Sequence, residues 1–161
     1  GLFPRSPHPA SCRVEKDMSQ YELPPIVRLA ERLVVMVEEA VRRFARYHKY
    51  TFGTELRQQA HAVLRLCHRA WRDKEAQDFW LDQLMWSVDE FKLSLQLGQH
   101  LQAYAGFAQC EALARHTAEL GRQCGGWRKQ HRAHGQKPPS GETAARSPIL
   151  SARAAPKGAQ P

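Results

Sequence analysis

The chain lacks a C-x-x-C pair, although it has four cysteines. Three of them fall inside helical apolar patterns, where a free thiol behaves as a small hydrophobic group. The cysteines are Cys12, Cys67, Cys110 and Cys124. Without a recognisable disulfide or zinc framework, the chain is expected to work in a reducing, cytoplasmic compartment.

Long apolar runs are also missing. No uninterrupted stretch approaches the roughly 18 to 20 residues that span a bilayer. The N-terminus has no basic segment followed by an apolar one, so we expect a protein that is neither secreted nor inserted into a membrane. The chain begins with Gly1, and residues 1–17 show no periodicity, which makes Met18 a candidate for the biological start.

Motifs of enzymes and metal carriers are absent from the sequence. It contains no Glu-x-x-His pair, no H-E-x-x-H and no glycine-rich phosphate loop. His61 and His68 lie seven residues apart, which places them on one helix face but beyond the reach of a single metal ion. Cys67 and His68 are adjacent, and neighbouring helical residues point about 100° apart, so ordinary packing of Cys67 is expected. We predict no catalytic site, no metal and no cofactor.

Basic residues are abundant. There are 24 Lys and Arg against 16 Asp and Glu, a net charge of +8, which favours polyanionic partners. Residues 24–72 carry ten basic and four acidic side chains, whereas residues 73–103 carry two basic and six acidic ones. Residues 104–132 return to five basic against two acidic side chains. With 161 residues, of which 42% are hydrophobic, the chain can form one core of ordinary size.

Apolar residues recur at helical spacing in four stretches. The first follows Pro24-Pro25, which suits a first helical turn, and is expected to end near residues 47–50. The second is expected to begin around Thr51, whose hydroxyl can cap the helix, and to end near Asp73. The predicted buried stripes are Ile26, Leu29, Leu33, Met36, Val37, Ala40, Val41 and Phe44, then Leu56, Ala60, Val63, Leu64, Cys67 and Trp71.

The third and fourth stretches complete the pattern. The third has a core stripe of Leu81, Leu84, Val88, Phe91 and Leu95, widened by Trp80, Leu93, Leu97 and Leu101. So broad an apolar face indicates contact with more than one neighbour. The fourth has Phe107, Cys110, Leu113, Ala114, Thr117, Leu120 and Cys124. Gly125-Gly126 is expected to end it, because glycine adopts the positive φ common just past a helix, and to turn Trp127 back onto the bundle or across a subunit boundary.

Four long helices with short connections predict an all-α fold, an antiparallel up-down-up-down four-helix bundle. The end of the chain from about Gly135 has five prolines among Gly, Ser, Ala and scattered basic residues, and it cannot bury enough apolar area to order itself. We therefore predict a disordered N-terminal segment over 1–23, the bundle over 24–130 and a disordered basic tail over 131–161.

Arginines line one side of the second predicted helix. Arg65, Arg69 and Arg72 lie at i, i+4 and i+7, where like charges repel unless a polyanion relieves them. Phosphate contact supplies that relief, so nucleic acid is the expected ligand. The complete predicted nucleic-acid-binding set is Arg42, Arg43, Arg46, Lys49, Arg65, Arg69, Arg72, Arg122, Arg128 and Lys129.

Two segments carry a family resemblance. Tyr47-His-Lys-Tyr-Thr-Phe-Gly53 resembles the basic-aromatic-Thr-x-Gly junction between the first two helices of the Avd family, the accessory variability determinants of diversity-generating retroelements. Glu119-Leu-Gly-Arg-Gln-Cys-Gly-Gly-Trp127 is similar to the E-[IL]-G-R-x-[LC]-G-[GS]-W signature near the end of those proteins. Between them, residues 89–97 are similar to the family's third helix. The resemblance covers about residues 24–130, and its structural motif residues here are Thr51, Gly53, Gly121, Gly125, Gly126 and Trp127.

The resemblance implies a non-enzymatic accessory subunit. It implies a homopentamer that binds the retroelement's reverse transcriptase and template RNA and supports mutagenic reverse transcription. Four-helix proteins encoded in intervening sequences of ribosomal RNA genes share the architecture and part of the pattern, and they remain an alternative. A bundle enzyme or metal carrier is a further alternative, disfavoured by the missing ligand pairs.

Overall fold

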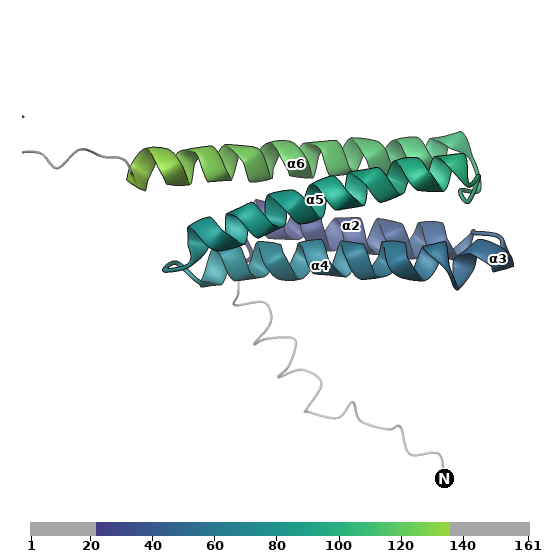
Figure 1. The fold of residues 1–161 in the computed structure, drawn as a ribbon, viewed down its shortest axis with the longest axis horizontal. Coiled ribbons are helices and arrows are strands. Elements are labelled where there is room, and N and C mark those ends of the chain that lie inside the picture. The colour runs from purple at the N-terminus through teal and green to yellow at the C-terminus, as the bar shows by residue number, and fades with distance from the viewer. Residues whose placement is uncertain (1–21, 136–161) are drawn as a thin grey trace, which may run out of the picture.

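The computed structural model describes residues 22–135. The elements in this range are α2 (Pro25–Arg42), α3 (Arg46–Lys49), α4 (Phe52–Arg72), α5 (Gln77–His100) and α6 (Phe107–Gly135). The four long helices alternate in direction along one axis (Figure 1). The predicted all-α fold and up-down-up-down bundle are confirmed. The disorder predicted for the two ends concerns residues 1–21 and 136–161, which lie outside the described part of the chain.

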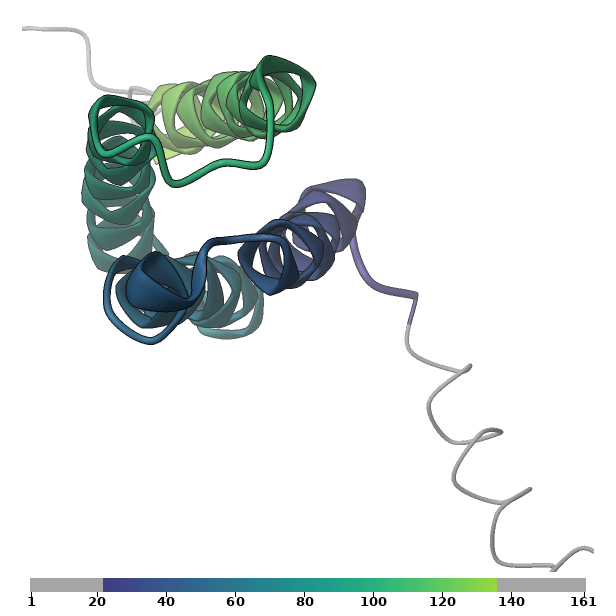
Figure 2. The ribbon, with the colours of Figure 1, turned by 90° about the vertical axis from the view of Figure 1, so that its right-hand side faces the viewer.

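The four long helices surround one core. α2 packs against α4 and α6, and α5 also packs against α4 and α6, so that α4 and α6 occupy opposite corners (Figure 2). None of the helices between residues 22 and 135 combines the length and apolar character needed to cross a bilayer.

The core contains most of the predicted stripes. Leu33, Leu56, Phe91 and Leu120, one from each long helix, have no exposed surface. Two residues of the fourth predicted stripe are corrected, because Phe107 is 72% exposed and Ala114 is also exposed. With about 100° between successive helical residues, Ala114 points away from the side on which Leu120 is buried.

The first helix ends earlier than predicted. α2 stops at Arg42 and a single separate turn, α3, fills the space before α4. Phe44 follows the break and is buried as predicted, with its ring stacked on Phe52 at 6.0 Å and edge-on to Tyr104 at 5.5 Å. At the end of α2 the Arg43 and Phe44 amides donate to the carbonyl oxygens three residues back, at 3.0 and 3.1 Å, so the last turn tightens and the α-helical pattern stops.

A close approach at Gly98 lets α5 fit over the same aromatic group. A Cβ added to Gly98 would lie 2.7 Å from both the Phe52 ring and the Tyr104 hydroxyl. That hydroxyl donates a hydrogen bond to the Leu95 carbonyl oxygen at 3.0 Å. Only glycine leaves room for this contact without a shift of the two aromatic side chains.

The predicted end of the last helix at Gly125-Gly126 is wrong. α6 continues through both glycines to Gly135, and neither has a φ in the left-handed region. Trp127 therefore lies within the helix, partly buried against the core. The tail predicted to begin at residue 131 is corrected as well, since residues 131–135 are helical. Contacts with α5, described below, account for the extension.

Candidate nucleic-acid interface

The predicted basic flank divides into two clusters at opposite ends of α4. The junction cluster consists of Arg42, Arg43, Arg46 and Lys49, around α3. The α4-terminal cluster consists of Arg65, Arg69 and Arg72. Figure 1 shows α3 at one end of the bundle and the end of α4 at the other. α4 has 21 residues, and at about 1.5 Å per residue Arg65, Arg69 and Arg72 lie about 20 to 30 Å along the helix from its start beside the junction cluster.

Both clusters consist of positive charges without an acidic partner. Within residues 22–135, no carboxylate oxygen lies within 4.0 Å of the charged nitrogens of these seven side chains. Six of the seven are exposed, and Lys49 is half-buried with its Nζ donating to the Arg42 carbonyl oxygen at 3.4 Å. Positive charges without a carboxylate partner attract a phosphate backbone more strongly than paired ones do.

Tryptophan rings hold two arginines of the α4-terminal cluster. The Arg69 guanidinium lies 5.0 Å from the centre of the Trp80 ring, and that of Arg72 lies 5.5 Å from Trp71. Such cation–π contacts fix the planar groups while leaving their N–H edges available to a ligand. The repulsion expected along this helix face is thus partly relieved within the chain itself.

Asp73 fixes the tryptophan under Arg69. The Trp80 Nε1–H donates to Asp73 Oδ2 at 3.0 Å, and the Ala76 amide donates to Oδ1 at 3.2 Å. These two hydrogen bonds, the one from Trp80 foremost, lower the pKa of Asp73 from its ordinary value. The carboxylate thereby ties the end of α4 to the beginning of α5.

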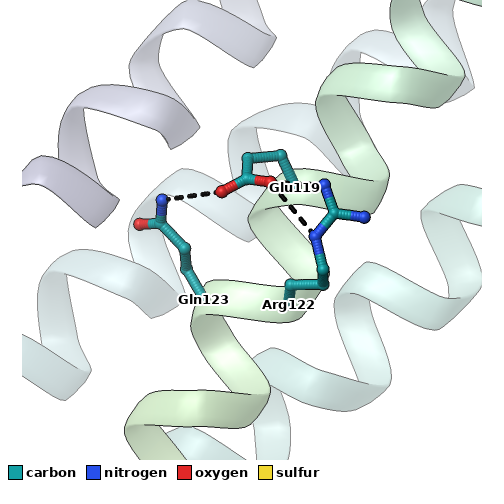
Figure 3. A network of polar contacts seen from close by, with 3 residues as sticks. All are labelled: Glu119, Arg122 and Gln123. Carbon is teal, nitrogen blue, oxygen red and sulfur yellow. Dashed lines mark hydrogen bonds and ion pairs between the residues drawn. The ribbon is translucent and has the colours of Figure 1, made fainter.

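The predicted α6 contributions to RNA binding are mostly ion-paired within the chain. Arg122 pairs with Glu119, which also accepts a hydrogen bond from Gln123 at 3.1 Å (Figure 3). The pKa of Glu119 is lowered, chiefly by the hydrogen bond from Arg122 and then by that from Gln123. Arg128 pairs with Asp82 on α5 at 2.7 Å. Only Lys129 of this group is exposed and without a carboxylate within 4.0 Å among the residues from 22 to 135.

The α6 residues also lie apart from the two clusters. α6 occupies the corner of the bundle opposite α4. Arg122 and Arg128 therefore extend neither cluster, and their predicted part in RNA binding remains a prediction.

The motif residues of the first junction have structural contacts. Thr51 does not cap α4 as predicted, because its Oγ1 donates instead to the Tyr47 carbonyl oxygen at 2.8 Å. A Cβ on Gly53 would lie 2.9 Å from Val41 Cγ1 and 3.1 Å from the His48 carbonyl oxygen. Small size at Gly53 is what allows α3 and α4 to fold closely against α2.

The motif glycines of α6 differ from one another. A Cβ on Gly121 would lie 3.0 Å from Lys92 Nζ, the movable end of a long side chain. At Gly125 and Gly126 an added Cβ would meet nothing within 4 Å. Gly126 and Trp127 instead line an open cleft of about 510 Å³ between α6 and the start of α2.

An apolar stripe lies exposed along the outside of α5. We call it the outer stripe, and it consists of Phe79, Trp86, Leu93, Leu97 and Leu101. Trp86 is 68% and Leu93 69% exposed. The intervals of seven and four place these side chains on the side of the helix opposite its core stripe. The apolar face of α5 is therefore as broad as the sequence predicted. No part of residues 22–135 covers the outer stripe.

Two of the thiols, Cys67 and Cys124, are buried in the core. Burial raises the pKa of both Cys67 and Cys124 to about 12, so neither thiol is ionised at neutral pH. Between residues 22 and 135, no three His, Cys, Asp or Glu side chains come together as a metal site would require. No protein-family model and no curated protein matches the chain.

Two exposed tyrosines of the junction were missed as candidate binding residues. Tyr47 is 80% and Tyr50 71% exposed, and both lie in the same stretch of sequence as the arginines of the junction cluster. The sequence contains a signal for their exposure. Both tyrosines lie outside the apolar stripes of the flanking helices and within a run of basic residues. Both also belong to the motif that resembles the Avd junction, and that motif carries no signal for exposure.

Proposed function

We propose that this chain is a non-enzymatic, RNA-binding accessory subunit of a diversity-generating retroelement. It binds template RNA and reverse transcriptase in the cytoplasm and supports mutagenic reverse transcription. The observation that carries the RNA-binding part is the pair of basic clusters without acidic partners, about 20 to 30 Å apart along α4. The assignment to a retroelement rests on the two motif segments that resemble the Avd family.

We further propose that the chain works as a homo-oligomer, for which the resemblance implies a pentamer. The outer stripe of α5 supports self-association, since exposed apolar stripes of this kind mark contacts. Residues 73–103, which contain the stripe, have six acidic and two basic side chains, whereas residues 24–72 have ten basic and four acidic ones. An α5–α5 contact would bring two acidic stretches together, so a contact between α5 of one copy and a different face of the next is favoured. Such head-to-tail contacts generate rings when the rotation closes.

The oligomer is tested by light scattering after size exclusion, at micromolar concentration. The wild-type chain is expected to elute as a defined oligomer. Trp86→Glu combined with Leu93→Glu should dissociate it, because each change places a charge in the contact. Ala114→Glu is the matched control, since Ala114 is exposed on α6 and lies outside both α5 and residues 24–72. A monomeric wild type, or a double variant of unchanged mass, would refute self-association through α5.

RNA binding is tested by salt titration with fluorescence anisotropy. The logarithm of affinity should fall linearly with the logarithm of salt, by about 0.7 per phosphate contact on a single strand. Replacing the three arginines of either cluster with Gln should therefore flatten the slope by up to about 2 and weaken binding to many sequences alike. The matched control is Arg57→Gln with Arg115→Gln, which removes two charges that are already paired to Glu38 and Glu111 and that lie outside the predicted binding set.

The tail beyond Lys137 requires a separate arm of this experiment. Its deletion removes Arg146, Arg153 and Lys157, which lie outside the described residues. Affinity should fall only modestly if the bundle is the binding element. Two results together would overturn the proposal: the truncated chain loses RNA binding, and the cluster variants keep the salt dependence of the wild type.

Genome context separates the two bundle alternatives. A neighbouring reverse transcriptase gene and a pair of near-identical repeats are expected for a retroelement and not for a ribosomal intervening sequence. Co-purification with that reverse transcriptase would support the proposal, and its failure with both proteins folded would refute the accessory role. Elemental analysis of the purified chain tests the metal-carrier alternative.

A further inference from the structure

The junction between α2 and α4 places its aromatic side chains on two sides. Phe44 and Phe52 are buried, 5% and 7% exposed, and form part of the core. Tyr47 and Tyr50 lie between them in sequence and project outward, 80% and 71% exposed. These two large rings are not buried by the described part of the chain. Exposed aromatic side chains of this kind indicate a surface that binds a ligand.

The backbone under the two tyrosines is well held. The His48 and Lys49 amides donate to the Ala45 carbonyl oxygen at 2.9 and 3.0 Å, which closes the turn of α3. The Thr51 hydroxyl donates to the Tyr47 carbonyl oxygen at 2.8 Å, and the Tyr47 ring meets His48 edge-on at 5.1 Å. A fixed backbone lowers the entropy that is lost when a ligand binds.

The spacing and helical backbone bring the two rings to the same side. Tyr50 follows Tyr47 by three residues and has φ −98° and ψ −2°, still in the right-handed helical region. Side chains three residues apart in a helical turn have Cβ atoms about 5 to 6 Å apart. The tyrosines therefore form one aromatic surface.

This aromatic surface lies within a stretch whose charged residues are all basic. Residues 40–54 contain four basic residues and no acidic one. Arg42, Arg43 and Arg46 are exposed, and no carboxylate oxygen lies within 4.0 Å of them in the part of the chain from 22 to 135. Aromatic rings beside unpaired positive charges are the arrangement that binds single-stranded nucleic acid, since bases stack while phosphates are neutralised.

We propose that Tyr47 and Tyr50 stack on unpaired bases of single-stranded RNA, whose phosphates are bound by Arg42, Arg43 and Arg46. The assignment rests on the proposed RNA-binding function and deepens it by naming the form of RNA recognised. A duplex presents no free base face at such a surface, so the junction discriminates single from double strands. Because every base has a π-face, it does so with little sequence preference.

The test uses the full chain and three fluorescent probes: a 20-nucleotide RNA of mixed sequence, the same RNA annealed to its complement, and an abasic strand of equal length. Tyr47→Ala and Tyr50→Ala should each weaken binding of the single strand by about 5- to 100-fold and leave the salt slope unchanged. Both variants should bind the duplex and the abasic strand as the wild type does. Tyr47→Phe and Tyr50→Phe should retain affinity, because the ring is kept.

Phe107→Ala is the matched control, since Phe107 is 72% exposed at the start of α6 and lies outside the basic stretch. Unchanged single-strand affinity in both alanine variants, with intact binding by the wild type, overturns the stacking role and leaves the proposed function standing. Absence of RNA binding by the wild type overturns both. Loss of affinity accompanied by a lower oligomer mass, or by lost reverse transcriptase binding, assigns the tyrosines to a protein contact and overturns the proposal.

Discussion

Replacing Gly125 and Gly126 with alanine should stabilise the protein. Both residues lie inside α6, which continues to Gly135, and neither has a φ in the left-handed region. A Cβ at either position would meet nothing within 4 Å, so the new methyl groups fit without a shift of any neighbour.

The size of the effect follows from helix propensity. A glycine in a helix interior is about 0.5 to 1 kcal/mol less favourable than alanine, because its unfolded backbone loses more freedom on folding. Gly125→Ala with Gly126→Ala should therefore raise the free energy of unfolding by about 1 to 2 kcal/mol. For a domain of this size that is a rise in Tm on the order of 4 to 8 °C.

The assay is urea unfolding followed by circular dichroism at 222 nm, at one protein concentration, because association alters apparent stability. Gly106→Ala is the matched control: an added Cβ there also meets nothing within 4 Å, but the residue precedes α6 and gains no helix propensity. A loss of stability in the double variant would show that the pair ends the helix with positive φ, where alanine costs about 1 to 2 kcal/mol per residue. It would refute the continuous α6.

Two further predictions concern the α4–α5 turn and the buried thiols. The pKa of Asp73 is lowered in the folded chain, so its contribution is present above its ordinary value of 3.8 and is lost as pH falls through the lower folded value. Thermal melts from pH 6 to pH 3 should show this loss in the wild type and less of it in Asp73→Asn; equal slopes would contradict the hydrogen-bonded turn. A thiol reagent should modify Cys110 in the native chain but Cys67 and Cys124 only after unfolding, because both are fully buried. Peptide mass spectrometry reads the labelled positions, and native labelling of either buried thiol would contradict the packing of the core.

The core was largely predictable because helical periodicity is a local property. Leu81, Leu84, Val88, Phe91 and Leu95 repeat at intervals of three and four, and all five are buried. The same reasoning located the end of α4 at its predicted place before Asp73. Helix ends were predicted less well, since α2 stops at Arg42 and α6 continues to Gly135.

The extension of α6 illustrates the limit. Gly125-Gly126 is a reasonable local stop signal, yet it is overridden by contacts of the residues that follow. Arg128 pairs with Asp82 at 2.7 Å, and Arg132 reaches Asp78 at 3.5 Å and Asp82 at 3.2 Å. Arg132 and Asp82 are 50 positions apart, so no local pattern could reveal the pair. Propensity is a weak prior that such tertiary contacts routinely outweigh.

The candidate interface shows the same division. The Arg122–Glu119 ion pair joins residues three apart on one helix, and the sequence alone contained that information. The separation of the basic residues into two clusters follows from the length of α4, whereas the outward position of Tyr47 and Tyr50 required the fold of the junction.

The sequence by itself determined the all-α class, the four long helices, the apolar stripes that join them and the excess of basic charge. These depend on spacing and composition, which are readable along the chain. The tertiary structure decided where α6 ends, which arginines are neutralised and which aromatic rings remain in water. Each of those depends on contacts between helices whose residues are distant in sequence, so neither local spacing nor composition displays them.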